Sequence, residues 1–287
     1  MTLLTKIKKD QFAHLTQNKK QNNIMICLIL GDTDFPKKII ENIKIKKIKY
    51  FIIDLSKKNI FKKNTNSFRI SIGQFGKMIQ LIKDKKCKKV LFAGKIAKPN
   101  FSSLRMDIKG FFYLSKIIKA AKLGDAAVIK LIINILKKEK IDVISSVSFN
   151  PELSLKKGNY TKIKPSLKDI NDIKKGKNYL NKINGYDYIQ GLIVRDGVII
   201  KKENYMGTKK MIQSIKPKLN NEGILIKLPK KKQDLRIDLP TIGLDTIKDC
   251  KKAGLKGVIM KHKQNIFLDK EACIKFANMH KIFITII

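Results

Sequence analysis

The chain has 287 residues, of which 43% are hydrophobic, and its 63 lysine and arginine residues against 23 acidic ones give a net charge of +40. This apolar share is enough to bury a core, which excludes a disordered chain, and no apolar run reaches the roughly 18 residues of a membrane span. Because lysines occur in nearly every segment, we attribute the charge to compositional bias, which leaves a weak attraction to acidic surfaces rather than a nucleic-acid site.

The first 23 residues are polar and rich in lysine, and they predict an N-terminal extension over 1–23. This segment lacks the basic-then-apolar order of a secretory signal, so we expect a cytoplasmic protein. The four cysteines lie far apart in the sequence, and none has a second cysteine or a histidine at the spacing of zinc ligands. They are expected to be buried free thiols.

Apolar strands alternate with helical patterns through the first half of the chain. Strands are expected over 24–30, 50–54 and 89–93, and helices over 35–43, 73–85, 111–122 and 124–138. Alternation at this spacing is typical of a parallel sheet covered by helices on both faces. We therefore predict an α/β fold whose N-terminal domain, 24–138, is Rossmann-like.

The charged stretch 137–140 ends this half, and an apolar strand over 141–147 is expected to open a C-terminal α/β domain, 139–287. Asp196 and Gly197 lie between two apolar runs and form a strong two-residue hairpin signal, so this domain should contain antiparallel pairing within a mixed sheet. Its other expected elements are strands over 188–194, 198–202, 223–228 and 257–260, and helices over 167–183, 208–215, 241–252 and from 269.

Glycine turns follow several of the expected strands. Gly31 ends the first strand just before a helix, a geometry in which backbone N–H groups and the helix N-terminus receive a phosphate. Turns over 73–76 and 93–95 also fall at strand ends, where α/β sheets bind ligands. A single glycine lacks the specificity of a dinucleotide motif, and a plain packing turn is the alternative for each of them.

The segment 233–243 carries the strongest acidic pattern, with Asp234, Arg236 and Asp238 at alternate positions. In an extended strand these side chains would project from one face, and a helix would start after it at Pro240. Two carboxylates beside a guanidinium would suit a metal-held phosphate or diphosphate. The alternative, which periodicity alone favours, is a surface strand with an ion pair and with Asp238 as a helix cap.

Several motifs occur in one order along nearly the whole chain from Ile24. They are 71–78, 90–99, 121–125, 190–191 with 197–198, 207–208 and, above all, 233–243 (Gln-Asp-Leu-Arg-Ile-Asp-Leu-Pro-Thr-Ile-Gly). In these motifs the chain resembles the UDP-2,3-diacylglucosamine pyrophosphatases of the LpxI type. The resemblance implies two domains that enclose a nucleotide-linked diacyl sugar between them. It also implies hydrolysis of the diphosphate to UMP and 2,3-diacylglucosamine 1-phosphate with a divalent metal, typically Mg²⁺, as an early step of lipid A synthesis.

The resemblance further implies roles for individual residues. Asp238 falls on the best supported catalytic position of the family and is expected to be a catalytic residue and a metal ligand. Glu203 is the second candidate metal ligand, and an exposed glutamate at a sheet edge is the alternative explanation for it. Substrate contacts are expected from Gly31, Phe75, Gly76, Gly94, Lys95, Thr208, Gln233 and Arg236.

Three departures set the chain apart from the family pattern. The usual glycine-rich first turn is reduced to 31–33, the usual Glu-Gly-Thr-Asp reads Met-Gly-Thr-Lys at 206–209, and the paired acids after Gly124 are replaced by Asp125 and Ala126. A non-catalytic nucleotide-sugar or lipid-binding relative is therefore the alternative function. A nucleic-acid-binding protein is the third, and the lack of an aromatic and basic motif speaks against it.

The predicted reaction is direct attack by water, because no histidine or cysteine has the partners of a covalent nucleophile. The expected substrate is a UDP-linked diacyl amino sugar, with its uridine diphosphate near Gly31, Phe75 and Gly94 and its reacting phosphates facing Asp238. The protein is expected to act in the cytoplasm as a peripheral protein on the anionic face of the inner membrane, without a specific nucleic-acid partner. Self-association into a homodimer is left open.

Overall fold

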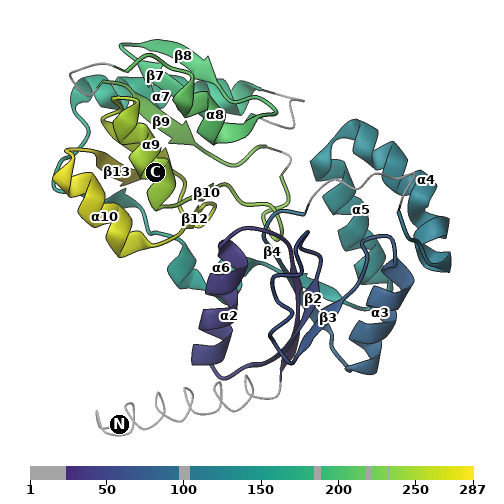
Figure 1. Cartoon of the computed structure of the whole chain (residues 1–287). Coiled ribbons are helices and arrows are strands. Elements are labelled where there is room, and N and C mark those ends of the chain that lie inside the picture. Colours follow the sequence, from purple (N-terminus) through teal and green to yellow (C-terminus); the bar gives the residue numbers. More distant parts are fainter. Residues whose placement is uncertain (1–23, 97–103, 184–188, 218–221, 232) are drawn as a thin grey trace, which may run out of the picture. The chain divides into compact units, whose positions relative to one another are not determined.

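The computed structural model describes residues 24–96, 104–183, 189–217, 222–231 and 233–287, which form two compact units (Figure 1). Unit 1 runs to Leu123 and also contains Ala127–Ser146, whereas unit 2 contains Gly124–Ala126 and Val147–Ile287. The expected extension 1–23, the end of the motif 90–99 and the start of the strand expected over 188–194 lie outside the described residues.

Among the described residues of unit 1, five parallel strands form one sheet in the order β3-β2-β1-β4-β5. Their bounds are β1 Met25–Leu30, β2 Lys49–Asp54, β3 Ser67–Arg69, β4 Lys89–Ala93 and β5 Asp142–Ile144. Nearly all of central β1 is buried, so both of its faces need cover. Helix α2 (Phe35–Ile45) lies on one face, and α3 (Phe75–Asp84) and α5 (Asp125–Lys138) lie on the other (Figure 1). The predicted parallel sheet with helices on both faces is confirmed.

Apolar periodicity places the helices of unit 1. Helix α3 buries Phe75, Met78, Ile79 and Ile82 on one face, as the spacing predicts. The helix expected over 111–122 forms as α4 (Ile108–Leu123), and the one expected over 124–138 forms as α5. Helix α4 differs from the others because Gly110 is its single buried residue, although all of the helix is described.

The strand expected over 141–147 belongs to the sheet of unit 1. It forms as the shorter β5, which pairs with β4, and Ser146–Phe149 then forms the short helix α6. The expectation that this strand opens the second half is wrong. A short apolar strand carries no sign of the sheet that it joins. The charged stretch before it contains the end of α5 and the tight turn that follows, where Lys140 has a φ of +61°.

The described part of unit 2 forms a mixed six-stranded sheet in the order β6-β13-β11-β9-β7-β8. Strands β13, β11 and β9 are parallel, whereas β6 pairs antiparallel with β13, and β7 pairs antiparallel with β9 and β8. The hairpin predicted at Asp196 and Gly197 is confirmed, since their φ angles of +50° and +73° are those of a type I′ turn. The strands of unit 2 are β6 Gly158–Asn159, β7 Gly191–Arg195, β8 Val198–Lys202, β9 Ile224–Lys227, β11 Gly257–Met260 and β13 Phe283–Ile286, with the separate pair β10 Thr241–Ile242 and β12 Ile266–Phe267.

Helices cover both faces of this second sheet. Residues Ile173 of α7, Leu192 of β7 and Ile226 of β9 pack in one apolar cluster. The neighbouring positions on the same strands, Ile193 and Leu225, point to the opposite face, where they pack against α8, α9 and α10. The helical segments of unit 2 are η2 Pro151–Leu153, α7 Leu167–Lys182, α8 Gly207–Gln213, α9 Leu244–Lys252 and α10 Lys270–Met279.

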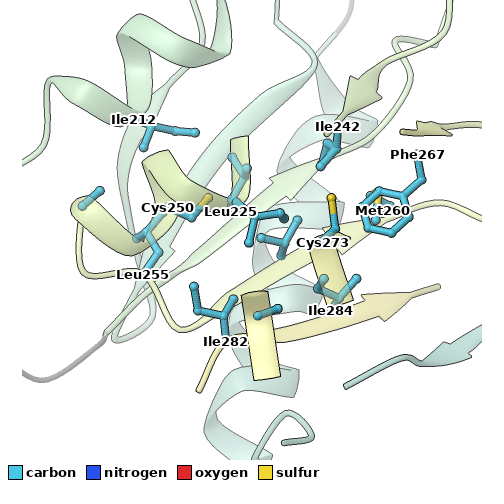
Figure 2. Packing of buried hydrophobic residues seen from close by; sticks show 14 of the residues in the cluster. Ile212, Leu225, Ile242, Cys250, Leu255, Met260, Phe267, Cys273, Ile282 and Ile284 are labelled. Carbon is cyan, nitrogen blue, oxygen red and sulfur yellow. The ribbon is translucent and has the colours of Figure 1, made fainter. Parts of the chain in front are cut away.

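The cluster on the α9 and α10 side is the larger core of unit 2 (Figure 2). It contains Cys250 and Cys273 among aliphatic side chains, and burial raises the pKa of the Cys273 thiol to about 12. Cys27 and Cys87 are buried in unit 1, and all four cysteines are free. The prediction of buried free thiols is therefore confirmed.

Candidate functional site

The acidic segment 233–243 turns rather than running extended. The N–H groups of Ile237 and Asp238 donate to the carbonyl oxygen of Asp234, at 3.2 and 2.9 Å. The Asp234 carboxylate accepts the backbone N–H of Arg236 at 3.0 Å, and such a local bond favours a turn over a strand. The expectation of an extended strand with the acids on one face is therefore wrong.

The helix expected from Pro240 starts later in the chain. Thr241 and Ile242 form β10, which pairs in parallel with β12, and α9 begins at Leu244 with Gly243 as its N-cap. The alternative explanation of Asp238 as a helix cap is removed, because no helix begins next to it.

Arg236 forms a bidentate ion pair with Asp234. Its Nε and Nη2 atoms donate to the two carboxylate oxygens at 2.9 and 2.7 Å. The guanidinium and the backbone N–H of Arg236 lower the pKa of Asp234, because they stabilise the ionised carboxylate more than burial disfavours it. The sequence predicts that Arg236 binds the diphosphate. In this conformation the Arg236 guanidinium would first have to leave the Asp234 carboxylate before it could bind a phosphate.

Asp238 lies in a loop with a lysine and a buried amide. Its side chain is 32% exposed, and the Lys230 Nζ lies 3.7 Å from its Oδ2. The backbone N–H of Lys230 donates to the Oε1 of Gln233 at 2.8 Å. Gln233 is buried, and its Nε2 has no hydrogen-bond partner within the described part of the chain. This loop therefore combines an acid that solvent reaches, a cation and unused amide donors.

A second group of polar side chains is buried within unit 2, and we call it the Lys–Thr–Glu chain. The Lys227 Nζ donates to the Thr208 Oγ1 at 2.6 Å, and that hydroxyl donates to the Glu203 Oε1 at 2.6 Å. The other carboxylate oxygen, Oε2, accepts the backbone N–H of Gln190 at 3.2 Å. All three side chains of the chain are buried, so their hydrogen bonds and opposite charges offset the cost of leaving water.

Three neighbouring elements position these side chains. Lys227 ends the buried strand β9, Thr208 lies in the first turn of α8, and Glu203 follows β8. The Nδ2 of Asn265 donates to the Lys227 carbonyl oxygen at 2.9 Å and holds the end of β9. The alternative explanation of Glu203 as an exposed edge glutamate is wrong, since its carboxylate is buried.

Lys227 couples the two groups electrostatically. Burial lowers the pKa of its ammonium, and the negative charges of Glu203 and Asp238 act in the opposite direction. This lysine was not predicted as a site residue, because a lysine at the end of an apolar strand is usually exposed. Its one signal is that it directly follows the three apolar residues Ile-Leu-Ile of a central strand. Asp238 thus has cationic neighbours both in its own loop and inside unit 2.

Of the two predicted metal ligands, Asp238 has the carboxylate that solvent reaches, whereas the Glu203 carboxylate is buried. Both carboxylate oxygens of Glu203 already accept hydrogen bonds, and the hydroxyl beside it also accepts from the Lys227 ammonium. Within the described ranges no group of three or more His, Cys, Asp or Glu side chains could hold a metal ion. Asp238 offers one partly exposed carboxylate, and Mg²⁺ is usually bound by one or two carboxylates together with substrate phosphates.

In unit 1 the structure brings Gly31, Gly94 and Lys95 together at the carboxyl ends of β1 and β4. The Gly31 N–H donates to the Ala93 carbonyl oxygen at 2.9 Å, and Asp32 exchanges two backbone hydrogen bonds with Lys95, at 2.8 and 2.9 Å. A Cβ on Gly31 would lie 2.4 Å from the Lys95 carbonyl oxygen, and Gly94 has a φ of +87°. These glycines allow two turns to touch, and the N–H groups of Gly31 and Lys95 are engaged with backbone rather than turned to a ligand.

The same edge is nevertheless where the strand order of the sheet reverses. Strand β2 lies on one side of β1 and β4 on the other, and doubly wound sheets bind ligands outside the carboxyl ends of strands at such a point. Thr33 has a φ of +93°, which is strained for a β-branched residue, and such strain clusters at ligand sites. The exposed side chain of Lys95 adds a positive charge to this edge.

Phe75 and Gly76 lie at the N-terminus of α3 and have structural partners there. Phe75 is buried and packs edge-to-face on Tyr113, with ring centroids 6.2 Å apart. The Asp107 carboxylate accepts the N–H groups of Lys77 and of Gly110 near the start of α4, both at 2.7 Å. Burial alone would raise the pKa of Asp107, but the N–H donors outweigh it and lower the pKa. A carboxylate of the chain thus binds an N–H group at the start of α3, in the region that the sequence predicts to lie near the uridine diphosphate.

Both halves of the chain match one protein family. The model of the LpxI N-terminal domain matches residues 25–153, and that of the LpxI C-terminal domain matches 156–285. The chain belongs to the LpxI family. Among curated proteins it is similar to a relative from Caulobacter vibrioides named "UDP-2,3-diacylglucosamine pyrophosphatase LpxI". The two are 31% identical over 223 residues, which are 75% of this chain and 80% of the relative.

The two LpxI domains meet in the sequence close to the division between the two units. Asp238, Arg236, Gln233, Glu203 and Thr208 lie in the part matched by the LpxI C-terminal domain. Gly31, Phe75, Gly76, Gly94 and Lys95 lie in the part matched by the N-terminal domain. The resemblance to this family is confirmed, while the roles of the individual residues stay predictions.

Proposed function

We propose that this protein hydrolyses the diphosphate of UDP-2,3-diacylglucosamine to UMP and 2,3-diacylglucosamine 1-phosphate in lipid A synthesis. The family match over both domains and the name of the Caulobacter relative support the substrate and the reaction. The observation that carries the proposal is the setting of Asp238, a carboxylate that solvent reaches with lysine cations nearby. A diphosphate brings negative charge that these cations can neutralise, and its hydrolysis needs a group that orients water.

The proposed mechanism uses water directly. The water oxygen attacks one phosphorus, the bond from that phosphorus to the bridging oxygen breaks, and the proton of the water passes to Asp238 or to solvent. Lys230 and the buried Lys227 stabilise the negative charge of the phosphate oxygens. The Gln233 amide nitrogen, which has no partner among the described residues, suits an oxygen of the substrate.

We propose that Asp238, rather than Glu203, holds the divalent cation of this reaction, and that Mg²⁺ is the ion. Asp238 provides the accessible carboxylate, and the substrate diphosphate provides further oxygen ligands of the kind that Mg²⁺ prefers. Bound there, the ion would neutralise charge on the diphosphate. The Lys–Thr–Glu chain would instead hold the Lys227 ammonium in a fixed position, where it interacts with the charge of Asp238.

The carboxyl edge of β1 and β4 is the proposed binding region for the uridine nucleotide. It lies at the reversal of strand order, and it combines a strained turn with the exposed Lys95 side chain. Gly31 and Gly94 would act by shaping the edge, since their close approach fixes the two turns. We expect the reaction at the cytoplasmic face of the inner membrane, because the substrate carries both a nucleotide and two acyl chains.

The test is incubation of the purified full chain with UDP-2,3-diacylglucosamine and Mg²⁺ in ¹⁸O-labelled water. The proposal predicts release of UMP and 2,3-diacylglucosamine 1-phosphate, with one ¹⁸O atom in one of the two products. The labelled product identifies which phosphorus is attacked. Saturable binding of the substrate without any UMP release would instead establish the non-catalytic relative and refute the proposed hydrolysis.

A further inference from the structure

Helix α4 exposes large apolar side chains that ordinary globular helices bury. Ile108 is 90% exposed, Phe111 71%, Phe112 64% and Leu123 79%. Their spacing of three and four residues, together with the lysines between them, places most of these positions along one side of the helix. We call this side the α4 outer face, defined by Ile108, Phe111, Phe112, Ser115, Lys116, Lys119, Lys122 and Leu123. Isolated exposed apolar residues are common, but a contiguous group marks an interaction surface.

The α4 outer face is also strongly basic. Helix α4 contains four lysines and no acidic residue. The Lys116 Nζ lies 5.4 Å from the centroid of the Phe112 ring and 5.9 Å from that of Tyr113, so cation and aromatic rings form one surface. Of these lysines, Lys109 pairs with Glu139, at 2.6 Å. Apolar side chains in the first turn and lysines in the later turns therefore face outward together.

Unit 1 holds this helix by its opposite side. Tyr113 packs on Phe75 of α3, and Asp107 ties the first turns of α3 and α4 through the N–H groups of Lys77 and Gly110. In Figure 1, α4 lies outside α3 and α5 relative to the sheet of unit 1. The helix is thus fixed to the fold while its outer face is presented to the surroundings.

We propose that the α4 outer face is a docking surface for an anionic lipid bilayer. A helix that lies in a membrane surface inserts aromatic and aliphatic side chains below the headgroups and places lysines among the phosphates. Within the described residues no helix is long and apolar enough to cross a membrane. The inference does not depend on the proposed hydrolysis, because lipid binding needs neither the substrate nor Asp238.

Charge and side-chain type favour lipid over two other occupants. A second copy of the chain paired through the same face would set lysines against lysines, with no acid on either helix. A single-stranded nucleic acid would use stacked aromatics and lysines, but it gives no partner to exposed aliphatic side chains such as Ile108 and Leu123. Acyl chains can pack against the apolar side chains of the α4 outer face, and anionic headgroups can bind its lysines.

The experiment is flotation of the full chain with unilamellar vesicles of phosphatidylcholine that contain 0 or about 30% phosphatidylglycerol, without substrate. The proposal predicts binding to the anionic vesicles that falls with added salt. The double variant Phe111→Ser and Phe112→Ser should weaken this binding by about tenfold or more, since both rings lose their insertion. The double variant Lys116→Gln and Lys119→Gln should weaken it and flatten its salt dependence.

The matched control is Ile45→Ser, which removes another exposed apolar residue of unit 1, 77% exposed on α2. It should bind anionic vesicles as the wild type does, and circular dichroism should show the same thermal unfolding for all variants. Wild-type vesicle affinity in the Phe111 and Phe112 variant would overturn the proposal. The proposal would also be overturned if the Phe111 and Phe112 variant bound vesicles like the wild type but had lost dimerisation, measured by light scattering, or binding to single-stranded RNA.

Discussion

Replacing Thr208 by valine tests whether the Lys–Thr–Glu chain holds unit 2 together. Valine keeps the size of threonine but removes the hydroxyl that bonds to both Lys227 and Glu203. Two buried charged groups then each lose a partner, and an unsatisfied buried group costs about 1–3 kcal/mol. The ammonium and the carboxylate can partly approach each other directly, so we expect the stability of unit 2 to fall by about 3 kcal/mol. This raises the equilibrium constant for opening of unit 2 by about a hundredfold.

The buried cysteines give the assay. Under native conditions a thiol reagent reaches each cysteine only when its unit opens, and peptide mass spectrometry identifies which cysteine has reacted. Cys250 and Cys273 report opening of unit 2, and Cys27 and Cys87 report opening of unit 1. The Thr208→Val variant should label the first pair about a hundredfold faster and leave the second pair unchanged.

The control for this prediction is Thr208→Ser, which keeps the hydroxyl and loses one methyl group. It should raise labelling of Cys250 by only about fourfold, from the roughly 0.8 kcal/mol of a buried methyl group. Equal labelling rates in the serine and valine variants would show that the hydroxyl stabilises nothing, and the reasoning about the Lys–Thr–Glu chain would fail.

Three further changes test other parts of the structure. Because the folded pKa of Asp107 lies below its ordinary value of 3.8, Asp107→Ala should destabilise unit 1 by about 1–2 kcal/mol at pH 7 in urea denaturation. The difference should vanish as the pH falls through the folded pKa, and a loss that persists in acid would contradict it. Gly31→Ala should destabilise unit 1 because its Cβ meets the Lys95 carbonyl at 2.4 Å. In the same thermal unfolding assay Gly243→Ala should cost less, because its Cβ has 3.5 Å to the nearest neighbour and the change only weakens the N-cap of α9. Glu203→Gln should leave the Mg²⁺ concentration for half-maximal turnover unchanged, and a large increase in it would make Glu203 a metal ligand after all.

Long periodic segments were the part of the fold that the sequence could predict. The buried face of α3 and the turn at Asp196 and Gly197 depend on local spacing and local backbone preference, and both form as predicted. Strand β5 could not be assigned to its sheet, because pairing with β4 is a contact between segments distant in the chain. The turn at Asp234 was not predicted either. The alternating pattern indicated a strand, but the hydrogen bond from the Arg236 N–H to the Asp234 carboxylate favours a turn.

The candidate site was predictable through its motif but not through its electrostatics. The resemblance points to Asp238, whereas the alternating pattern predicts an extended strand there in place of the observed turn. The role of Lys227 could hardly be predicted, because a lysine stands out as a site residue only when it is buried. Its burial depends on how the strands of the sheet assemble, which the sequence alone does not show. Asp107 gave none either, since its role as a shared cap requires α3 and α4 to start side by side.

Whether Asp238 takes part in the reaction is measured by the turnover of Asp238→Asn, as UMP release from UDP-2,3-diacylglucosamine. We expect a loss of kcat of about a thousandfold with substrate binding largely retained, because the carboxylate acts mainly in the transition state. The matched control is Asp234→Asn, which alters a neighbouring acid that is already paired with Arg236 and should cost far less. Near-normal kcat in Asp238→Asn, or an equal loss in both variants, would contradict the assignment of Asp238 to the reaction.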